Sequence, residues 1–173
     1  NINKFKEYFT EAFVISGFQT ETDVTRALSE YKDEMSLSEV KYYDEYEKSN
    51  DRTKSKTAEF FANSRSDSMK SYDDIKSCLA DSIKKALVDN VFYSIANVKN
   101  YSALTDVISN KTNVELLEIT DNEISSYLKN KYKVNKKLAG TSFDKVSEFK
   151  KAFLQALNSE GEKIPSSMTG GSG

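Results

Sequence analysis

The sequence contains no histidine and only one cysteine, Cys78, among its 173 residues. Histidine is the usual general acid or base of enzymes and the commonest transition-metal ligand, so its absence excludes Ser-His-Asp and Cys-His triads. One cysteine cannot form an internal disulfide, and without histidine it cannot complete a zinc or iron–sulfur site. We therefore expect no catalytic residue, no metal and no small-molecule cofactor, and a protein that binds rather than catalyses.

Proline and glycine are nearly absent from the body of the chain. Pro165 is the only proline, and residues 18 to 139 contain neither proline nor glycine. These two residue types interrupt regular secondary structure most strongly, and β-rich folds use many of them in turns and loops. Their absence over more than a hundred residues favours helices joined by turns of Ser, Asn, Asp and Thr.

Long apolar runs are also missing. The most apolar stretch, residues 86–98, is interrupted by Asp89, Asn90 and Ser94. A membrane span needs roughly 18 to 20 apolar residues, so we expect no membrane contact. Together with the single cysteine, this predicts a location in the cytoplasm or inside a virion. The low-proline composition, rich in Lys, Asn and Ser, suits a bacterial or phage protein.

Apolar residues instead recur at helical spacing. Between Ile2 and Ile15, one face of a helix would carry Phe5, Tyr8, Phe9, Ala12 and Phe13. The same spacing predicts further helices at about 23–34, 36–47, 58–62, 72–98, 120–132 and 143–158. The sequence therefore predicts a mainly α fold. We expect one domain of five to seven helices over 1–165, followed by a flexible Gly/Ser tail at 166–173 that reads as an appended linker.

Capping residues mark where several of these helices begin. Ser36–Glu39 and Thr120–Glu123 both fit the capping box, in which a Ser or Thr side chain and a Glu three residues later cap the helix reciprocally. Ser142 is the expected cap of the last helix. Residues 113–119 leave open one short β element, because short apolar runs are ambiguous between strand and helix. Residues 90–98 also alternate, so a strand stays an alternative there. Residues 48–57 contain no large apolar side chain and predict either a loop or a solvated helix start, and the polar residues 63–70 predict a mobile connection.

Charge is divided along the chain. Residues 21–47 hold nine acids against three bases, whereas residues 129–151 hold eight lysines against two acids. The whole chain carries a formal charge of only −2, so we expect a dipolar molecule. Surfaces of opposite sign steer protein partners and support head-to-tail self-association.

The acidic segment carries three tyrosines, Tyr42, Tyr43 and Tyr46. On a helical period of 3.6 they cannot all face one core, so at least one is expected on the surface. Exposed tyrosine is enriched at protein interfaces. The three tyrosines are therefore the candidate partner-binding residues.

The basic segment carries the second candidate surface. Its lysines interleave with Tyr132, which suits contact with phosphates and stacking of a base. The candidate phosphate- or anion-contacting residues are Lys129, Lys131, Lys133, Lys136 and Lys137. Lysine near a helix C-terminus is also favourable without any ligand, so a solvated face is the structural alternative.

These observations predict a non-catalytic protein–protein interaction protein or a structural component of an assembly, which binds a protein partner or a second copy of itself. The alternative is a nucleic-acid-associated protein that uses the Lys-rich segment 129–151. A third alternative is an enzyme with carboxylate-only chemistry, for which the clusters of Asp and Glu show no paired-site motif.

Overall fold

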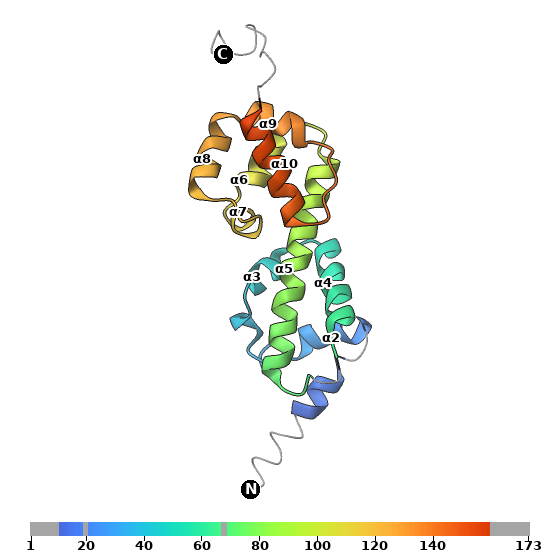
Figure 1. Cartoon of the computed structure of the whole chain (residues 1–173). Helices are drawn as coiled ribbons and strands as arrows, with labels where there is room; N and C mark the ends of the chain where they lie inside the picture. Colours follow the sequence, from blue (N-terminus) through green and yellow to red (C-terminus); the bar gives the residue numbers. More distant parts are fainter. Residues whose placement is uncertain (1–10, 19–20, 67–68, 160–173) are drawn as a thin grey trace. The chain divides into compact units, whose positions relative to one another are not determined.

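The computed structural model describes residues 11–18, 21–66 and 69–159, and these residues form helices and turns (Figure 1). The predicted mainly α fold is confirmed, and the described residues contain no strand. The chain divides into two compact units, unit 1 over Asn1–Asn90 and unit 2 over Val91–Gly173. The single domain expected over 1–165 stays a prediction. The tail at 166–173 lies outside the described residues.

Unit 1 begins with a helical segment at 11–16. It continues with α2 (Glu21–Glu30), the 3-10 helix η1 (Leu37–Glu39), α3 (Tyr43–Lys48) and α4 (Asp51–Ser64). The long helix α5 (Tyr72–Asn97) contains the boundary between the units. Unit 2 continues with α6 (Ala103–Ser109), α7 (Lys111–Leu116), α8 (Asp121–Lys129), α9 (Lys131–Leu138) and α10 (Val146–Asn158).

The expected number of five to seven helices is wrong. Beyond the segment at 11–16, the described residues hold nine α-helices, α2 to α10, and one 3-10 helix. One cause is that the helix expected over 120–132 is two helices, because Asn130 separates α8 from α9. A second cause is that α7 lies in a segment for which a short strand was left open.

The β element expected at 113–119 is wrong, because most of this segment belongs to α7. The side chain of Asn110 accepts a hydrogen bond from the backbone N–H of Asn113 at 3.1 Å, which caps the start of the helix. Leu116, Leu117 and Ile119 are buried at the end of the helix and just after it. An apolar run at the end of a short helix therefore imitates a strand in the sequence.

Residues 48–57, for which a loop and a solvated helix start were both open, hold a helix start, since α4 begins at Asp51. The side chain of Asn50 accepts from the backbone N–H of Thr53 at 2.8 Å and caps this helix. Its inward face carries Thr53 and Thr57, both fully buried. The buried face of this helix start was not predicted, because half of the buried face of α4 is threonine, which has no signature in an apolar pattern.

The two capping boxes have different outcomes. The box at Thr120–Glu123 is confirmed, with both of its hydrogen bonds present. The box at Ser36–Glu39 is wrong: Ser36 has a left-handed backbone with φ of 53° and makes no side-chain cap, and only η1 follows. Burial of Met35, Leu37 and Val40 overrides the local capping signal here. Ser142 is not the last cap either, because α10 begins after Lys145.

Unit 1 has a core drawn from all of its helices. The N-terminal helical segment contributes Val14, and Phe18 just after it packs on Phe61 of α4 with ring centroids 5.5 Å apart. Phe13 instead remains 63% exposed. The described part of this segment therefore buries a different face from the one predicted, while Phe5, Tyr8 and Phe9 lie outside the described residues.

The face that α5 buries changes along its length. Val91 follows Ala86 by five residues, which places it about 140° further around the helix axis at 3.6 residues per turn. The strand alternative at 90–98 is wrong. Where the buried face of a helix changes, the spacing of its apolar residues resembles the alternation of a strand. The buried residues are Ile75, Leu79, Ile83 and Ala86 in unit 1, and Val91, Phe92 and Ile95 in unit 2.

Unit 2 has an aromatic core. Phe149 and Phe153, one turn apart on α10, stack with ring centroids 5.4 Å apart, and Phe149 meets Phe143 edge-on at 5.6 Å. Tyr127 of α8 packs on Phe153 at 5.7 Å. The predicted inward face of the last helix is therefore correct, and it anchors α8 to α10. Over the described ranges of both units, no helix is long and apolar enough to cross a membrane.

Candidate functional surfaces

The three candidate tyrosines differ in exposure. Tyr43 and Tyr46 are buried in the core of unit 1, with exposed fractions of 3% and 7% and ring centroids 5.7 Å apart. Tyr42 is half-buried and has a left-handed backbone with φ of 67° at the start of α3. The expectation that at least one tyrosine lies at the surface therefore rests on Tyr42, and the partner-binding role of all three stays a prediction.

Carboxylates gather around Lys32 beside these tyrosines. The Lys32 ammonium lies 2.6 Å from the Glu47 carboxylate and 5.9 Å from the centroid of the Tyr43 ring. The hydrogen bond to Glu47 raises the pKa of Lys32 most, and the charges of Asp33 and Asp44 add to it. Asp33, Asp44 and Glu47 are all exposed. We call these three carboxylates the acidic surface of unit 1.

The pKa values of the neighbouring tyrosines are raised as well. Burial, and then the charge of Glu47, raises the pKa of Tyr43 to about 12. Burial also raises the pKa of Tyr46. The hydrogen bond from Lys32 lowers the pKa of Glu47. At neutral pH this region therefore presents fixed carboxylate charge around neutral rings.

The candidate lysines of unit 2 divide into those that the fold uses and those that it leaves exposed. The Lys133 ammonium donates to the backbone carbonyls of Leu157 and Ser159, each at 2.9 Å. These carbonyls belong to the end of α10, where backbone acceptors lack helical partners. Lys136 is half-buried and has an interaction partner. Lys129, Lys131 and Lys137 are exposed.

Two of the exposed lysines lie at the junction of α8 and α9 with apolar side chains beside them. Leu128 is 47% exposed and Tyr132 is half-buried. Asn130 alone separates the helices, and its side-chain amide donates to the Ser126 carbonyl at 2.8 Å. No ion pair within the described part of the chain involves Lys129 or Lys131. We call Leu128, Lys129, Lys131 and Tyr132 the α8–α9 corner.

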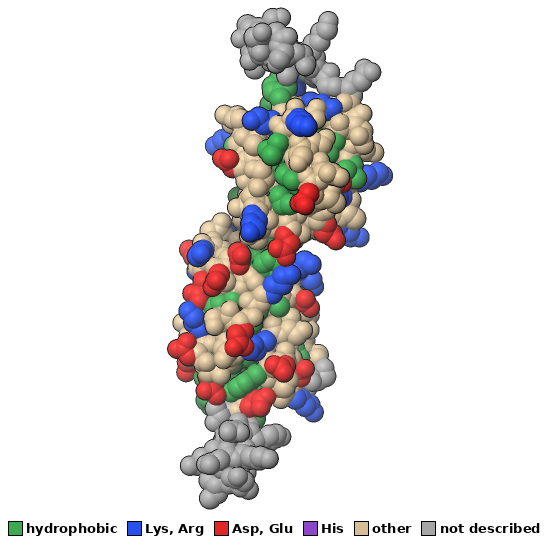
Figure 2. All heavy atoms as spheres, turned by 90° about the vertical axis from the view of Figure 1, so that its left-hand side faces the viewer, with side chains coloured by type: hydrophobic (Ala, Val, Ile, Leu, Met, Phe, Trp, Pro, Cys, Tyr) green, Lys and Arg blue, Asp and Glu red, His purple; other side chains and the backbone are tan. Residues whose placement is uncertain are grey.

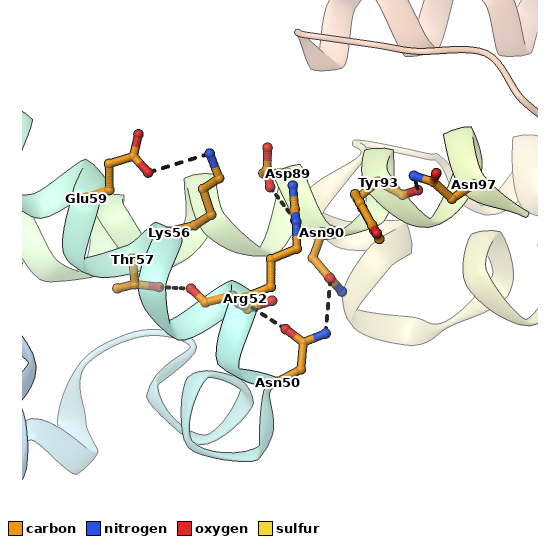
Figure 3. Close-up of polar contacts among 10 residues, drawn as sticks. Asn50, Arg52, Lys56, Thr57, Glu59, Asp89, Asn90, Tyr93 and Asn97 are labelled. Atoms are coloured by element: carbon orange, nitrogen blue, oxygen red, sulfur yellow. Dashed lines mark hydrogen bonds and ion pairs between the residues drawn. The ribbon is translucent and has the colours of Figure 1, made fainter.

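Several polar contacts were not predicted from the sequence. In Figure 3, Arg52 of α4 points toward Asp89 of α5, with 2.6 Å between Nη1 and Oδ2. Both of these atoms are shielded from solvent. Asn50 reaches Asn90 at 3.5 Å on the same side (Figure 3). These contacts were not predicted because residues 48–57 could be either a loop or a solvated helix start, although the spacing of Asn50 and Thr53 is a helix-capping signal.

A second unpredicted contact lies in unit 2. The Lys150 ammonium lies 2.5 Å from the Glu123 carboxylate and 2.8 Å from the Glu118 carbonyl. Glu118 itself has a positive φ of 57°, which reverses the chain after α7. Lys150 therefore joins α10 to the start of α8. Like Lys133, it comes from the basic segment but serves the fold.

Hollows border the segment 66–69 in unit 1. One has a volume of about 220 Å³ and is lined by apolar side chains such as Phe18 and Ile75, together with Arg65. Another, of about 370 Å³, is lined by polar groups that include Asp74, Asp81 and Cys78. We assign no ligand to either hollow.

Acidic and basic side chains are spread over the surface, with small hydrophobic patches between them (Figure 2). Unit 1 carries eighteen acids against fourteen bases and unit 2 carries nine against eleven, which gives net charges of −4 and +2. Among the residues with described positions, no group of three or more His, Cys, Asp or Glu could hold a metal ion. Comparison with known proteins found no matching family model, curated protein or solved structure.

Proposed function

We propose that this chain is a non-catalytic binding component that contacts a protein partner through the α8–α9 corner of unit 2. The observation that carries the proposal is the composition of this corner. Leu128 is 47% exposed, and the exposed Lys129 and Lys131 lie within three residues of it. An apolar centre with a charged rim is the usual anatomy of a protein interface.

Lys129 and Lys131 differ from other lysines of the basic segment, although Lys129 also suits the helix dipole in the last turn of α8. Lys133 and Lys150, from the same basic segment, hold backbone carbonyls of unit 2. Lys129 and Lys131 contribute no ion pair within the described ranges. Neighbouring like charges repel one another, so a negatively charged partner would offset the repulsion between these two lysines in the free protein.

The test is an affinity capture from an extract of the native cell, read by mass spectrometry. The wild type should retain a defined protein. The double variant Lys129→Glu/Lys131→Glu should retain about tenfold less, because the reversed charges repel a partner that the native charges attract. Lys99→Glu/Lys111→Glu is the matched control, since it changes two exposed lysines of the same unit by the same net charge.

Equal retention by the corner variant and the control would refute the proposal, as would the absence of any specifically retained protein. Thermal unfolding of each variant checks that the fold is intact. All four lysines are exposed, so the unfolding midpoints are expected to stay close to that of the wild type.

Nucleic-acid association is the second candidate function. The observation that favours it is Tyr132, a half-buried ring directly after the exposed Lys131. A ring beside lysines suits base stacking with phosphate contact. Affinity for a single-stranded oligonucleotide would then fall steeply with salt. The double variant Lys129→Glu/Lys137→Glu should weaken it further, whereas Lys133 is unsuitable for reversal because it also caps α10.

A further inference from the structure

We propose that the partner of the α8–α9 corner is the acidic surface of unit 1 on a second copy of this chain. This inference rests on the proposed function and names its partner. Two copies would then associate head to tail, with the corner of one molecule on Asp33, Asp44 and Glu47 of the next.

The first argument is the match in charge. The corner presents the ammonium groups of Lys129 and Lys131 without an ion pair in the described part of the chain. The acidic surface presents three exposed carboxylates around the Lys32 ammonium, and the charge of Lys54 also acts on Glu47. The charge of its exposed carboxylates is opposite in sign to that of the two lysines of the corner. Complementary charge of this kind sets the partner and the register of an interface.

The second argument is the match in the side chains beside these charges. Leu128 and Tyr132 accompany the lysines, and Tyr42 lies between Lys41 and the buried Tyr43 beside the acidic surface. The Lys41 ammonium lies 5.1 Å from the centroid of the Tyr42 ring. Each surface therefore combines charge with partly exposed apolar or aromatic area. The charges proposed to meet have opposite signs. Like surfaces would repel, so an association of corner with corner is disfavoured.

A contact between two different surfaces of the same protein is heterologous, and it yields either a closed ring or a growing chain. The average mass should therefore rise with protein concentration. It should fall with salt, because exposed charges are screened beyond about 10 Å at 0.1 M ionic strength. Association of the two surfaces within a single molecule would leave the mass independent of concentration.

The experiment measures mass by analytical ultracentrifugation, at low and high salt, for the whole chain and two charge-reversed variants. Lys129→Glu/Lys131→Glu reverses the corner. Asp33→Lys/Asp44→Lys reverses the acidic surface and leaves the Lys32–Glu47 ion pair in place. Each variant alone then presents two surfaces of the same sign and should be monomeric. An equimolar mixture restores opposite signs at every contact and should associate about as strongly as the wild type.

Restored association in the mixture supports the proposal, and misfolded variants could not produce it. A wild type that stays monomeric at low salt and about 100 μM would overturn it, because the dissociation constant would then lie above about 100 μM, which corresponds to about −5.5 kcal/mol. Association that persists in either single variant, or a mixture that stays monomeric, would also overturn it. If the wild type is monomeric but the corner still captures another protein from the extract, this inference fails and the proposed function stands.

Discussion

Units 1 and 2 bury polar groups in different ways. In unit 2, the buried Tyr127 hydroxyl donates to the Asn135 side chain at 2.5 Å, and the Asn135 amide donates to the Thr105 hydroxyl at 3.0 Å. In unit 1, the buried Thr53 hydroxyl has no hydrogen-bond partner among the described residues. A satisfied network specifies a core, whereas an unsatisfied group lowers stability. The comparison indicates that unit 1 can be stabilised by removing polarity and unit 2 cannot.

Both units direct some cations to carboxylates and others to backbone carbonyls. Unit 1 pairs Lys32 with Glu47 and Arg52 with Asp89, and Arg65 donates to the backbone carbonyl of Phe18. Unit 2 directs Lys133 and Lys150 to backbone carbonyls as well. A lysine-rich segment is therefore not a binding surface as a whole. Only the lysines that the fold leaves exposed can carry the proposed contact.

The largest expected effect separates the two cores. Phe149→Ala removes a fully buried ring that packs on Phe143 and Phe153, and it should cost about 3–5 kcal/mol of unfolding free energy. Amide hydrogen exchange should accelerate in α8 and α10 of unit 2, because Tyr127 of α8 packs on Phe153 in the same ring cluster. Amides of α2 and α4 in unit 1 should keep their protection. Equal acceleration in both units would show that the two cores unfold together.

Phe13→Ala is the control for this substitution. The same chemical change is made at a ring that is 63% exposed, so the loss of stability should stay within about 0.5 kcal/mol. A loss comparable to that of Phe149→Ala would mean that Phe13 is covered in solution.

The second prediction breaks the polar network of unit 2. Tyr127→Phe keeps the ring packed on Phe153 but removes the hydroxyl that donates to Asn135. The Asn135 side-chain oxygen then lacks this donor in a buried site, which should cost about 1–3 kcal/mol. Chemical denaturation measures the loss. No measurable destabilisation would show that the network contributes nothing, and the contrast between the units would disappear.

The helical class of the fold could be predicted from the sequence. The division of the chain into two units could not. The absence of Gly and Pro from 18 to 139 predicted helices, and the Thr120–Glu123 box predicted the start of α8 correctly. The pattern failed where burial was polar, as at Thr53 in α4, or where a helix changed its buried face, as in α5. Periodicity reports apolar burial on one face, so both cases are invisible to it.

The candidate sites could be predicted as segments but not residue by residue. The charge runs pointed to the regions of Tyr42 and Lys129, and the structure leaves both at least partly exposed. Nothing in the sequence distinguishes Lys133, which holds the end of α10, from Lys131, which is exposed. That distinction depends on where α10 ends in space, which is a tertiary property.

The third prediction uses pH to isolate a contact of unit 2. The hydrogen bond from Lys150 lowers the pKa of Glu123 below its ordinary 4.5. A lowered carboxyl pKa stabilises the fold above the unfolded pKa, and this stability is lost as the pH falls through the folded value. Glu123→Gln keeps an N3 residue able to complete the capping box but removes the charge. It should cost about 1 kcal/mol at pH 7.

The two proteins should become equally stable once the pH is below the folded pKa of Glu123. Thermal unfolding from pH 7 to pH 3 measures this convergence. A stability difference that does not depend on pH would assign the effect to packing instead of charge. The pKa of Asp74 is also lowered, by hydrogen bonds of the loop before α5, but this contribution is the same in both proteins and cancels in the comparison.

The smallest expected effect has the opposite sign and tests the comparison in unit 1. Thr53→Val replaces the buried, unpartnered hydroxyl with a methyl group of nearly the same volume. The backbone carbonyl of Thr53, which accepts from the Thr57 hydroxyl at 2.9 Å, is unchanged. Removal of an unsatisfied polar group should stabilise the protein by up to about 1 kcal/mol, since threonine and valine have nearly the same helix propensity. Thr57→Val is the matched control in the same helix, because its hydroxyl does have a partner and the substitution should destabilise. If both variants lose stability, the Thr53 hydroxyl is satisfied in solution and unit 1 buries its polar groups as unit 2 does.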